Sequence, residues 1–201
     1  GIGVSTVGEA EVFFNNGFTN IFIASEIVTN QKIRRLCILA RHADITVAVD
    51  NEENIADLSE SATAFGVTVN VVVDINTRLN RCGVEPGHPA LKLARLVNKS
   101  QHLEFVGLMT IEGSILTTDT DFLVTESRRC AQNILDTREL IEKDGMDVGL
   151  VSLGGTHNYD IVGDIDGITE VPAGSYALMD SRYQPYREHE DHIGSHNYLQ
   201  Q

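Results

Sequence analysis

The sequence predicts an α/β fold, a (β/α)8 TIM-type barrel that is incomplete at its N-terminus. Short apolar segments alternate with helix-like segments along the chain, and such alternation is typical of a parallel sheet. The strand-like segments are apolar throughout instead of at every second residue, as expected where both faces of a sheet are covered. We count about seven strands, so the chain supplies most of a barrel of eight.

The first segments show how the elements are inferred. Residues 1–6 have the pattern of the end of a strand and not of a chain start, which indicates a fragment. Residues 7–15 predict a helix, because apolar residues recur on one helical face. Thr6 and Glu9 have the spacing of a capping box, which places the start of this helix.

The remaining elements continue the alternation. Strands are predicted at residues 20–24, 45–49, 67–73, 103–109, 148–153 and 167–171, and helices at 30–40, 51–65, 89–98 and 121–144. Gly66 and Gly145 follow two of these helices and are typical C-terminal caps. A doubly wound open sheet is the alternative fold. No Gly-x-Gly-x-x-Gly follows any strand, which argues against a dinucleotide-binding fold.

Composition limits the class of protein. With 201 residues, 42% of them hydrophobic, the chain can bury one sizeable core. Its net charge of -14 argues against nucleic acid and anionic membranes as partners, and no apolar run is long enough to span a bilayer. Its three cysteines are an odd number without paired spacing. Free thiols in a reducing compartment account for them, so we predict a cytoplasmic protein.

Two predicted strands end in glycine followed by a hydroxyl residue. One ends in Gly154, Gly155 and Thr156, and the other in Gly174 and Ser175. Glycine lets the backbone approach a ligand closely, and successive N–H groups beside a hydroxyl suit an anion. We therefore predict one phosphate held from both sides, with two ordinary strand-to-loop turns as the alternative.

Other charged residues also follow predicted strands, where a barrel carries its chemistry. Arg81 lies in the segment 76–84 and could neutralise an anionic oxygen of a ligand, or pair with Asp74. Asp50 and Asp74 end neighbouring strands. They could form a carboxylate pair for acid–base work, or cap the helix and loop that follow.

Four motifs, in this order, carry a family resemblance. They are Asn76-Thr77-x-Leu79-Asn80-Arg81-Cys82-Gly83-Val84, Gly107-Leu108-Met109-Thr110-x-Glu112-Gly113, Val151-Ser152-x-Gly154-Gly155-Thr156-x-x-Tyr159-Asp160, and Thr169-Glu170-x-x-Ala173-Gly174-Ser175-Tyr176-x-x-Met179-Asp180. Together they resemble the D-threonine aldolase and D-serine dehydratase family, whose barrel is like the N-terminal domain of alanine racemase (fold type III). The resemblance reaches Tyr183, so we expect one barrel domain over 1–183 and a disordered polar tail over 184–201.

The resemblance implies pyridoxal 5'-phosphate as the cofactor and gives each candidate residue a role. The two glycine-containing strand ends would cradle its phosphate, and Arg81 would lie near its phenolic oxygen. Such groups position and tune the ring, while the cofactor supplies the electron sink. The cofactor-binding residues expected on this basis are Arg81, Gly154, Gly155, Thr156, Tyr159, Gly174, Ser175 and Tyr176.

The resemblance also implies an activity, a lyase that cleaves the Cα–Cβ bond of D-β-hydroxy amino acids, as D-threonine aldolase does. Dehydration of D-serine or 3-hydroxy-D-aspartate, a non-catalytic pyridoxal phosphate-binding barrel, and a phosphate-binding barrel enzyme without this cofactor are the alternatives. At positions 157 and 158, His and Asn replace a common Gly-Thr or Pro-Thr pair of the family.

Parts of the family's active site are expected outside this chain. The lysine that binds the cofactor would precede residue 1, and none of the four lysines ends a predicted strand: Lys32, Lys92, Lys99 and Lys143. We therefore expect the fragment itself to be inactive. The family's metal ligands lie in a C-terminal β-domain, so the resemblance implies a divalent metal and a homodimer for the complete protein and no metal ligand in this chain.

Overall fold

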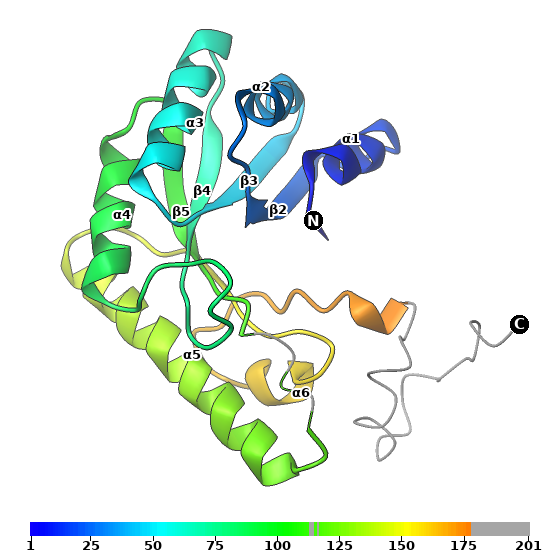
Figure 1. Ribbon diagram of the computed structural model, residues 1–201, viewed down its shortest axis with the longest axis vertical. Helices are drawn as coiled ribbons and strands as arrows, with labels where there is room; N and C mark the ends of the chain where they lie inside the picture. The colour runs from blue at the N-terminus through cyan, green and yellow to red at the C-terminus, as the bar shows by residue number, and fades with distance from the viewer. Residues whose placement is uncertain (113–114, 116, 178–201) are drawn as a thin grey trace, which may run out of the picture.

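The computed structural model describes residues 1–112, 115 and 117–177. Its centre is one six-stranded parallel sheet, and helices lie in an arc along one side of it (Figure 1). The elements in chain order are β1 (Ile2–Val4), α1 (Val7–Asn15), β2 (Asn20–Glu26), α2 (Asn30–Leu39), β3 (Asp44–Val49), α3 (Glu52–Phe65), β4 (Val69–Asp74), α4 (His88–Lys99), β5 (Leu103–Met109), α5 (Thr120–Lys143), β6 (Leu150–Ser152), α6 (Tyr159–Val162) and a 3-10 turn (Ser175–Ala177).

The order of the strands decides between the two predicted folds. Each strand pairs with the next strand of the sequence, from β1 to β6, and all pairs are parallel. A doubly wound sheet would instead reverse its order at a switch point. The described residues therefore form a half-barrel, and the prediction of an eight-stranded barrel is confirmed only to this extent.

The seventh predicted strand, at 167–171, is wrong as an element. This segment does lie beside β6, because Leu153 N donates to Glu170 O at 3.1 Å and Thr169 N donates to Val151 O at 3.0 Å. Only one bridge, between Ser152 and Glu170, results. The apolar pattern of this segment is therefore not matched by a ladder of strand length.

Side chains on the two faces of the sheet form two hydrophobic clusters. The larger cluster lies between the strands and the helices and includes Ile21 and Val47, which are fully buried. The smaller cluster lies on the opposite face and consists of Phe22, Ala48, Val72 and Met109. Covering on both faces explains why these strands are apolar throughout.

Caps place the helix ends where the sequence predicts them. The predicted capping box at the start of α1 is present, with Glu9 N donating to Thr6 Oγ1 at 3.2 Å and Thr6 N donating to Glu9 Oε2 at 3.0 Å. Asn51 caps the start of α3, and Gly66 ends that helix in the left-handed conformation at φ 63. These contacts satisfy backbone groups that a helix leaves without partners at its ends.

The sheet requires a glycine where β5 meets β6. A Cβ at Gly107 would lie 1.9 Å from the carbonyl oxygen of Leu150, which is far inside van der Waals contact. The absence of a side chain therefore lets β6 lie against β5 and places the loop after β6 beside the loop after β5.

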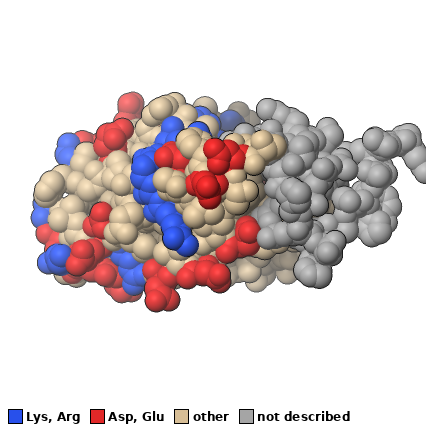
Figure 2. Space-filling model, turned by 90° about the horizontal axis from the view of Figure 1, so that it is seen from below, with Lys and Arg blue, Asp and Glu red and all other residues tan. Residues whose placement is uncertain are grey.

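The surface of α5 carries paired charges. In the view from below, basic side chains form a narrow stripe with acidic side chains on either side (Figure 2). On α5, Arg138 pairs with Glu142 at 2.8 Å and Lys143 pairs with Glu139 at 2.9 Å. Such exposed pairs contribute little stability, about 0–1 kcal/mol each.

Two sequence predictions fall on residues that are not described. The domain boundary after residue 183 and the tail over 184–201 lie in the range 178–201, outside the described residues. Within the described part of the chain, none of the helices combines the length and the apolar character needed to cross a membrane.

Candidate functional site

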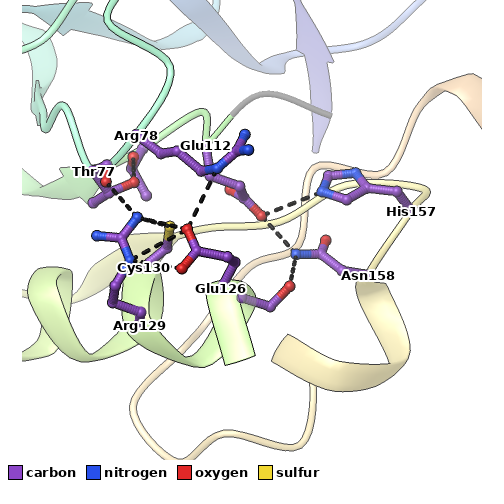
Figure 3. Close-up of polar contacts among 10 residues, drawn as sticks. Thr77, Arg78, Glu112, Glu126, Arg129, Cys130, His157 and Asn158 are labelled. Carbon is purple, nitrogen blue, oxygen red and sulfur yellow. Dashed lines mark hydrogen bonds and ion pairs between the residues drawn. The ribbon is translucent and has the colours of Figure 1, made fainter. Parts of the chain in front are cut away.

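Polar loops follow β4, β5 and β6 at one edge of the sheet. Because parallel strands end at the same edge, these loops are neighbours although they are far apart in sequence. Figure 3 shows two sets of contacts, both of which involve α5: one joins the loop after β4 to Glu126 and Arg129, and the other joins Glu112 after β5 and the loop after β6 to Ser127. This is the edge at which barrel proteins hold their ligands.

The loop after β6 is a tight turn. Gly154 has φ 99, and a Cβ on it would lie 2.5 Å from Cγ2 of Val162, so only glycine fits here. The Gly154 N–H donates to Glu112 Oε2 at 3.2 Å, and the Gly155 N–H donates to Asn158 Oδ1 at 3.0 Å. Both N–H groups are therefore engaged within the protein, and the two glycines act here through the shape of the loop.

The two glycine-containing segments meet. Tyr176 N donates to Thr156 Oγ1 at 3.0 Å. Thr156 is buried at 4% exposure, and the Ser175–Ala177 turn begins beside it. A Cβ at Gly174 would meet no atom of the described residues within 4 Å, so these residues leave the space next to this backbone open. The predicted convergence is therefore present in the fold, while the ligand roles of Thr156, Gly174, Ser175 and Tyr176 stay predictions.

Tyr159 lies one turn further on. It is the first residue of α6 and is half-buried. Asn158 precedes it as the N-cap residue, but the Asn158 side chain makes no cap hydrogen bond because it is used elsewhere in the site. The predicted contribution of Tyr159 to cofactor binding stays a prediction.

The loop after β4 is shaped by its own side chains. Asn76 Nδ2 donates to Asn80 Oδ1 at 2.8 Å, and Asn80 N donates to Asn76 Oδ1 at 3.0 Å. Asn80 takes the left-handed conformation at φ 53, which asparagine tolerates better than most residues. At Gly83 a Cβ would lie 2.7 Å from Asn76 N. These contacts bring the loop back sharply and present Arg81 at the surface.

Side chains of helix α5 contact this same loop. Glu126 pairs with Arg78 at 3.5 Å, and Arg129 Nη2 donates to the Thr77 carbonyl at 3.3 Å (Figure 3). The Thr77 hydroxyl lies 2.8 Å from the Thr110 hydroxyl in a buried contact. The loop that carries Arg81 is thus tied both to α5 and to the residue after β5.

A cluster of carboxyl groups lies at the ends of β2, β3 and β4. Burial raises the pKa of Asp74 from 3.8 to about 8, the carboxyl of Glu26 adds to the rise, Arg81 opposes it, and Asp50 raises it further. Asp74 is 3% exposed. Glu26 Oε1 is buried without a hydrogen-bond partner among the described residues. A protonated Asp74 can form a hydrogen bond with the Glu26 side chain.

The same cluster includes a thiol. Ligand atoms of Glu26, Asp50 and Cys82 lie within 4.8 Å of one another, a spacing that a cation can bridge. Burial raises the pKa of the Cys82 thiol, and Glu26 adds to this effect. The sequence analysis named Asp50 and Asp74 but missed Glu26. It named Glu112 only as part of a motif and missed its contacts, and it missed Ser127, since the partners of both residues lie far away in sequence.

These features define a class: an α/β half-barrel whose polar loops meet at the carboxyl edge of its parallel sheet. Residues 1–181 match the family model described as alanine racemase, N-terminal domain. The chain therefore belongs to the family of the alanine racemase N-terminal domain.

Several proteins and solved structures are similar to this chain. The chain is 32% identical over 184 residues to D-threonine aldolase of Arthrobacter sp, and the matched region covers 91% of this chain and 48% of the relative. It is 31% identical over 186 residues to 3-hydroxy-D-aspartate aldolase of Paracoccus denitrificans (strain Pd 1222), with the same two coverages. The crystal structure of D-threonine aldolase from Filomicrobium marinum is similar with a TM-score of 0.87 and 36% identity, over 91% of this chain and 50% of that one. The chain thus spans about half the length of the relatives it matches.

Proposed function

We propose that this chain is the pyridoxal 5'-phosphate-binding half-barrel of a lyase that cleaves D-β-hydroxy amino acids, of the D-threonine aldolase type. The observation that carries the proposal is the hydrogen bond from Tyr176 N to Thr156 Oγ1 at 3.0 Å. It brings the ends of two segments to one place, beside the open space next to Gly174. Convergence of hydroxyl and backbone groups on one small volume is what a phosphate requires.

The chain's own residues divide the work. Thr156, Ser175 and the backbone of Gly174 and Ser175 would hold the phosphate, the Tyr176 N–H holds Thr156 in place, and Gly154 and Gly155 shape the turn that presents Thr156. Arg81, on the loop held by α5, would bring its positive charge near the phenolic oxygen of the cofactor. When bound, the cofactor supplies an electron sink for the carbanion left at Cα.

The reaction belongs to the complete protein and not to this chain alone. Both named relatives and the solved structure above are aldolases, and the chain spans about half of each. The lysine that binds the cofactor, a divalent metal and its ligands, and the second subunit of a homodimer would come from the rest of that protein, which we place in the cytoplasm.

A binding experiment tests the cofactor site. Pyridoxal 5'-phosphate and pyridoxal are titrated separately into the chain by fluorescence, and the phosphate ester should bind more tightly. Replacing Thr156→Val removes the acceptor for Tyr176 N and should weaken binding of the ester by roughly five- to tenfold, because about one hydrogen bond is lost. Thr63→Val, on the exposed face of α3, is the matched control.

The outcomes separate the alternatives. If the chain binds pyridoxal 5'-phosphate and pyridoxal with equal affinity, the proposed phosphate site is refuted. In the complete protein, an aldolase releases glycine and acetaldehyde from D-threonine, while a dehydratase releases ammonia and a keto acid. If ammonia is the product, the complete protein is a dehydratase and not an aldolase.

A further inference from the structure

Glu112 lies at the centre of a buried hydrogen-bond network behind the loop after β6. It is 1% exposed. Its Oε2 accepts from Gly154 N at 3.2 Å, and its Oε1 accepts from Asn158 Nδ2 at 2.6 Å. His157 Nε2 lies 3.6 Å from the same Oε1 (Figure 3). A buried carboxylate is costly unless donors surround it, and here the loop itself supplies the donors.

Asn158 extends the network and has only one satisfactory orientation. Its Oδ1 accepts from Gly155 N at 3.0 Å, and its Nδ2 donates both to Glu112 and to Ser127 Oγ at 2.9 Å. Reversing the amide would set its NH2 against the Gly155 N–H and its oxygen against the carboxylate. Asn158 is fully buried, so water offers no alternative partner.

The network therefore decides which groups face the ligand. Both glycine N–H groups of the loop point toward Glu112 and Asn158, and the next residue, Thr156, is the one that meets Tyr176. We propose that Glu112 is a positioning residue that, with Asn158, fixes this loop so that Thr156 is presented to the phosphate. The proposal rests on the proposed function, in which that phosphate belongs to the cofactor.

Single substitutions should break the network in a defined way. Glu112→Gln keeps the shape of the side chain but offers one acceptor where two donors arrive. If its oxygen serves Gly154 N, its NH2 faces Asn158 Nδ2, and turning Asn158 around leaves Gly155 N without an acceptor. Asn158→Asp instead places a second carboxylate against Glu112. Each variant leaves an unmatched buried group, and such groups are expensive.

The double variant restores the match. In Glu112→Gln/Asn158→Asp, the new amide donates to the new carboxylate and its oxygen accepts from Gly154 N, while the carboxylate accepts from Gly155 N and from the Ser127 hydroxyl. Donors and acceptors are then paired again, and one negative charge has moved from position 112 to position 158. A double-mutant cycle of this kind isolates the coupling between two residues.

The experiment measures the ratio of the affinities for pyridoxal 5'-phosphate and pyridoxal in the four proteins of the cycle. Each single variant should reduce this ratio by about tenfold, because one hydrogen-bond mismatch is comparable to a tenfold change in an equilibrium, and the double variant should restore it to within about threefold. Glu104→Gln, an exposed glutamate on β5, is the control and should leave the ratio unchanged. A purely structural role would lower stability without changing this ratio.

Failure of this proposal is distinct from failure of the proposed function. If the unaltered chain binds both compounds equally, the phosphate site itself is absent. If it prefers the phosphate ester and the folded single variants keep that preference, the positioning role of Glu112 is refuted. If a single variant does not fold, the double variant still decides: loss of the preference in a folded double variant would also overturn the proposal.

Discussion

Replacing Asp74→Asn tests the carboxyl cluster at the ends of β2, β3 and β4. In the folded chain the pKa of Asp74 is raised from 3.8 to about 8, mainly by burial and next by Glu26. The folded state therefore keeps a proton at this position between about pH 4 and pH 8 that the unfolded chain releases. Folding stability should fall as the pH rises through this window, and the neutral amide of the variant should not show the loss.

The size of the effect follows from one proton. A difference of one bound proton changes the free energy of unfolding by about 1.4 kcal/mol per pH unit. From pH 5 to pH 7 the variant should therefore gain about 3 kcal/mol relative to the unaltered protein.

Urea unfolding of both proteins at pH 5, 6 and 7 measures this difference. Asp164→Asn is the control, because Asp164 is exposed and its replacement should give curves parallel to those of the unaltered protein. A constant stability difference between the Asp74→Asn variant and the unaltered protein across the three pH values would refute the raised pKa of Asp74.

Two further changes test the fold. Gly107→Ala sets a Cβ 1.9 Å from the Leu150 carbonyl oxygen, and the overpacking should cost about 3 kcal/mol, measured by urea unfolding; a loss below about 1 kcal/mol would mean that β6 can move away from β5 at little cost. Thr6→Ala removes the side-chain half of the capping box and should cost about 1 kcal/mol, with Thr63→Ala on α3 as the control; an unchanged unfolding midpoint would contradict the cap.

Local rules account for most of the elements that the sequence predicts. The predicted helix at 7–15 and the predicted strand at 103–109 coincide with α1 and β5. Both are bounded by strong local signals: a capping box in the first case and an apolar run between polar loops in the second. The predicted strand at 167–171 has no such support, because tertiary position and not apolar pattern limits it to one bridge.

The candidate site likewise contains residues that the sequence predicts and residues that it does not. Placing ligand residues at strand ends brings Thr156 and Tyr176 together correctly. Glu26 was missed because β2 runs on to this residue past the predicted end at 24, with a register shift between Ile23 and Glu26. Such irregularities re-aim side chains and have no signature in an apolar run. Ser127 was missed because a single hydroxyl on a long helix carries no periodic signal.

Helix α5 contacts both halves of the proposed site within about one turn. Glu126 and Arg129 contact the loop after β4, which carries Arg81, and Ser127 accepts a hydrogen bond from Asn158 in the loop after β6. The separation of these anchor points is set by the helical rise of about 1.5 Å per residue. The helix therefore fixes the distance between the loop after β4 and the loop after β6, and inserting one residue between Glu126 and Arg129 should displace contacts to both loops at once.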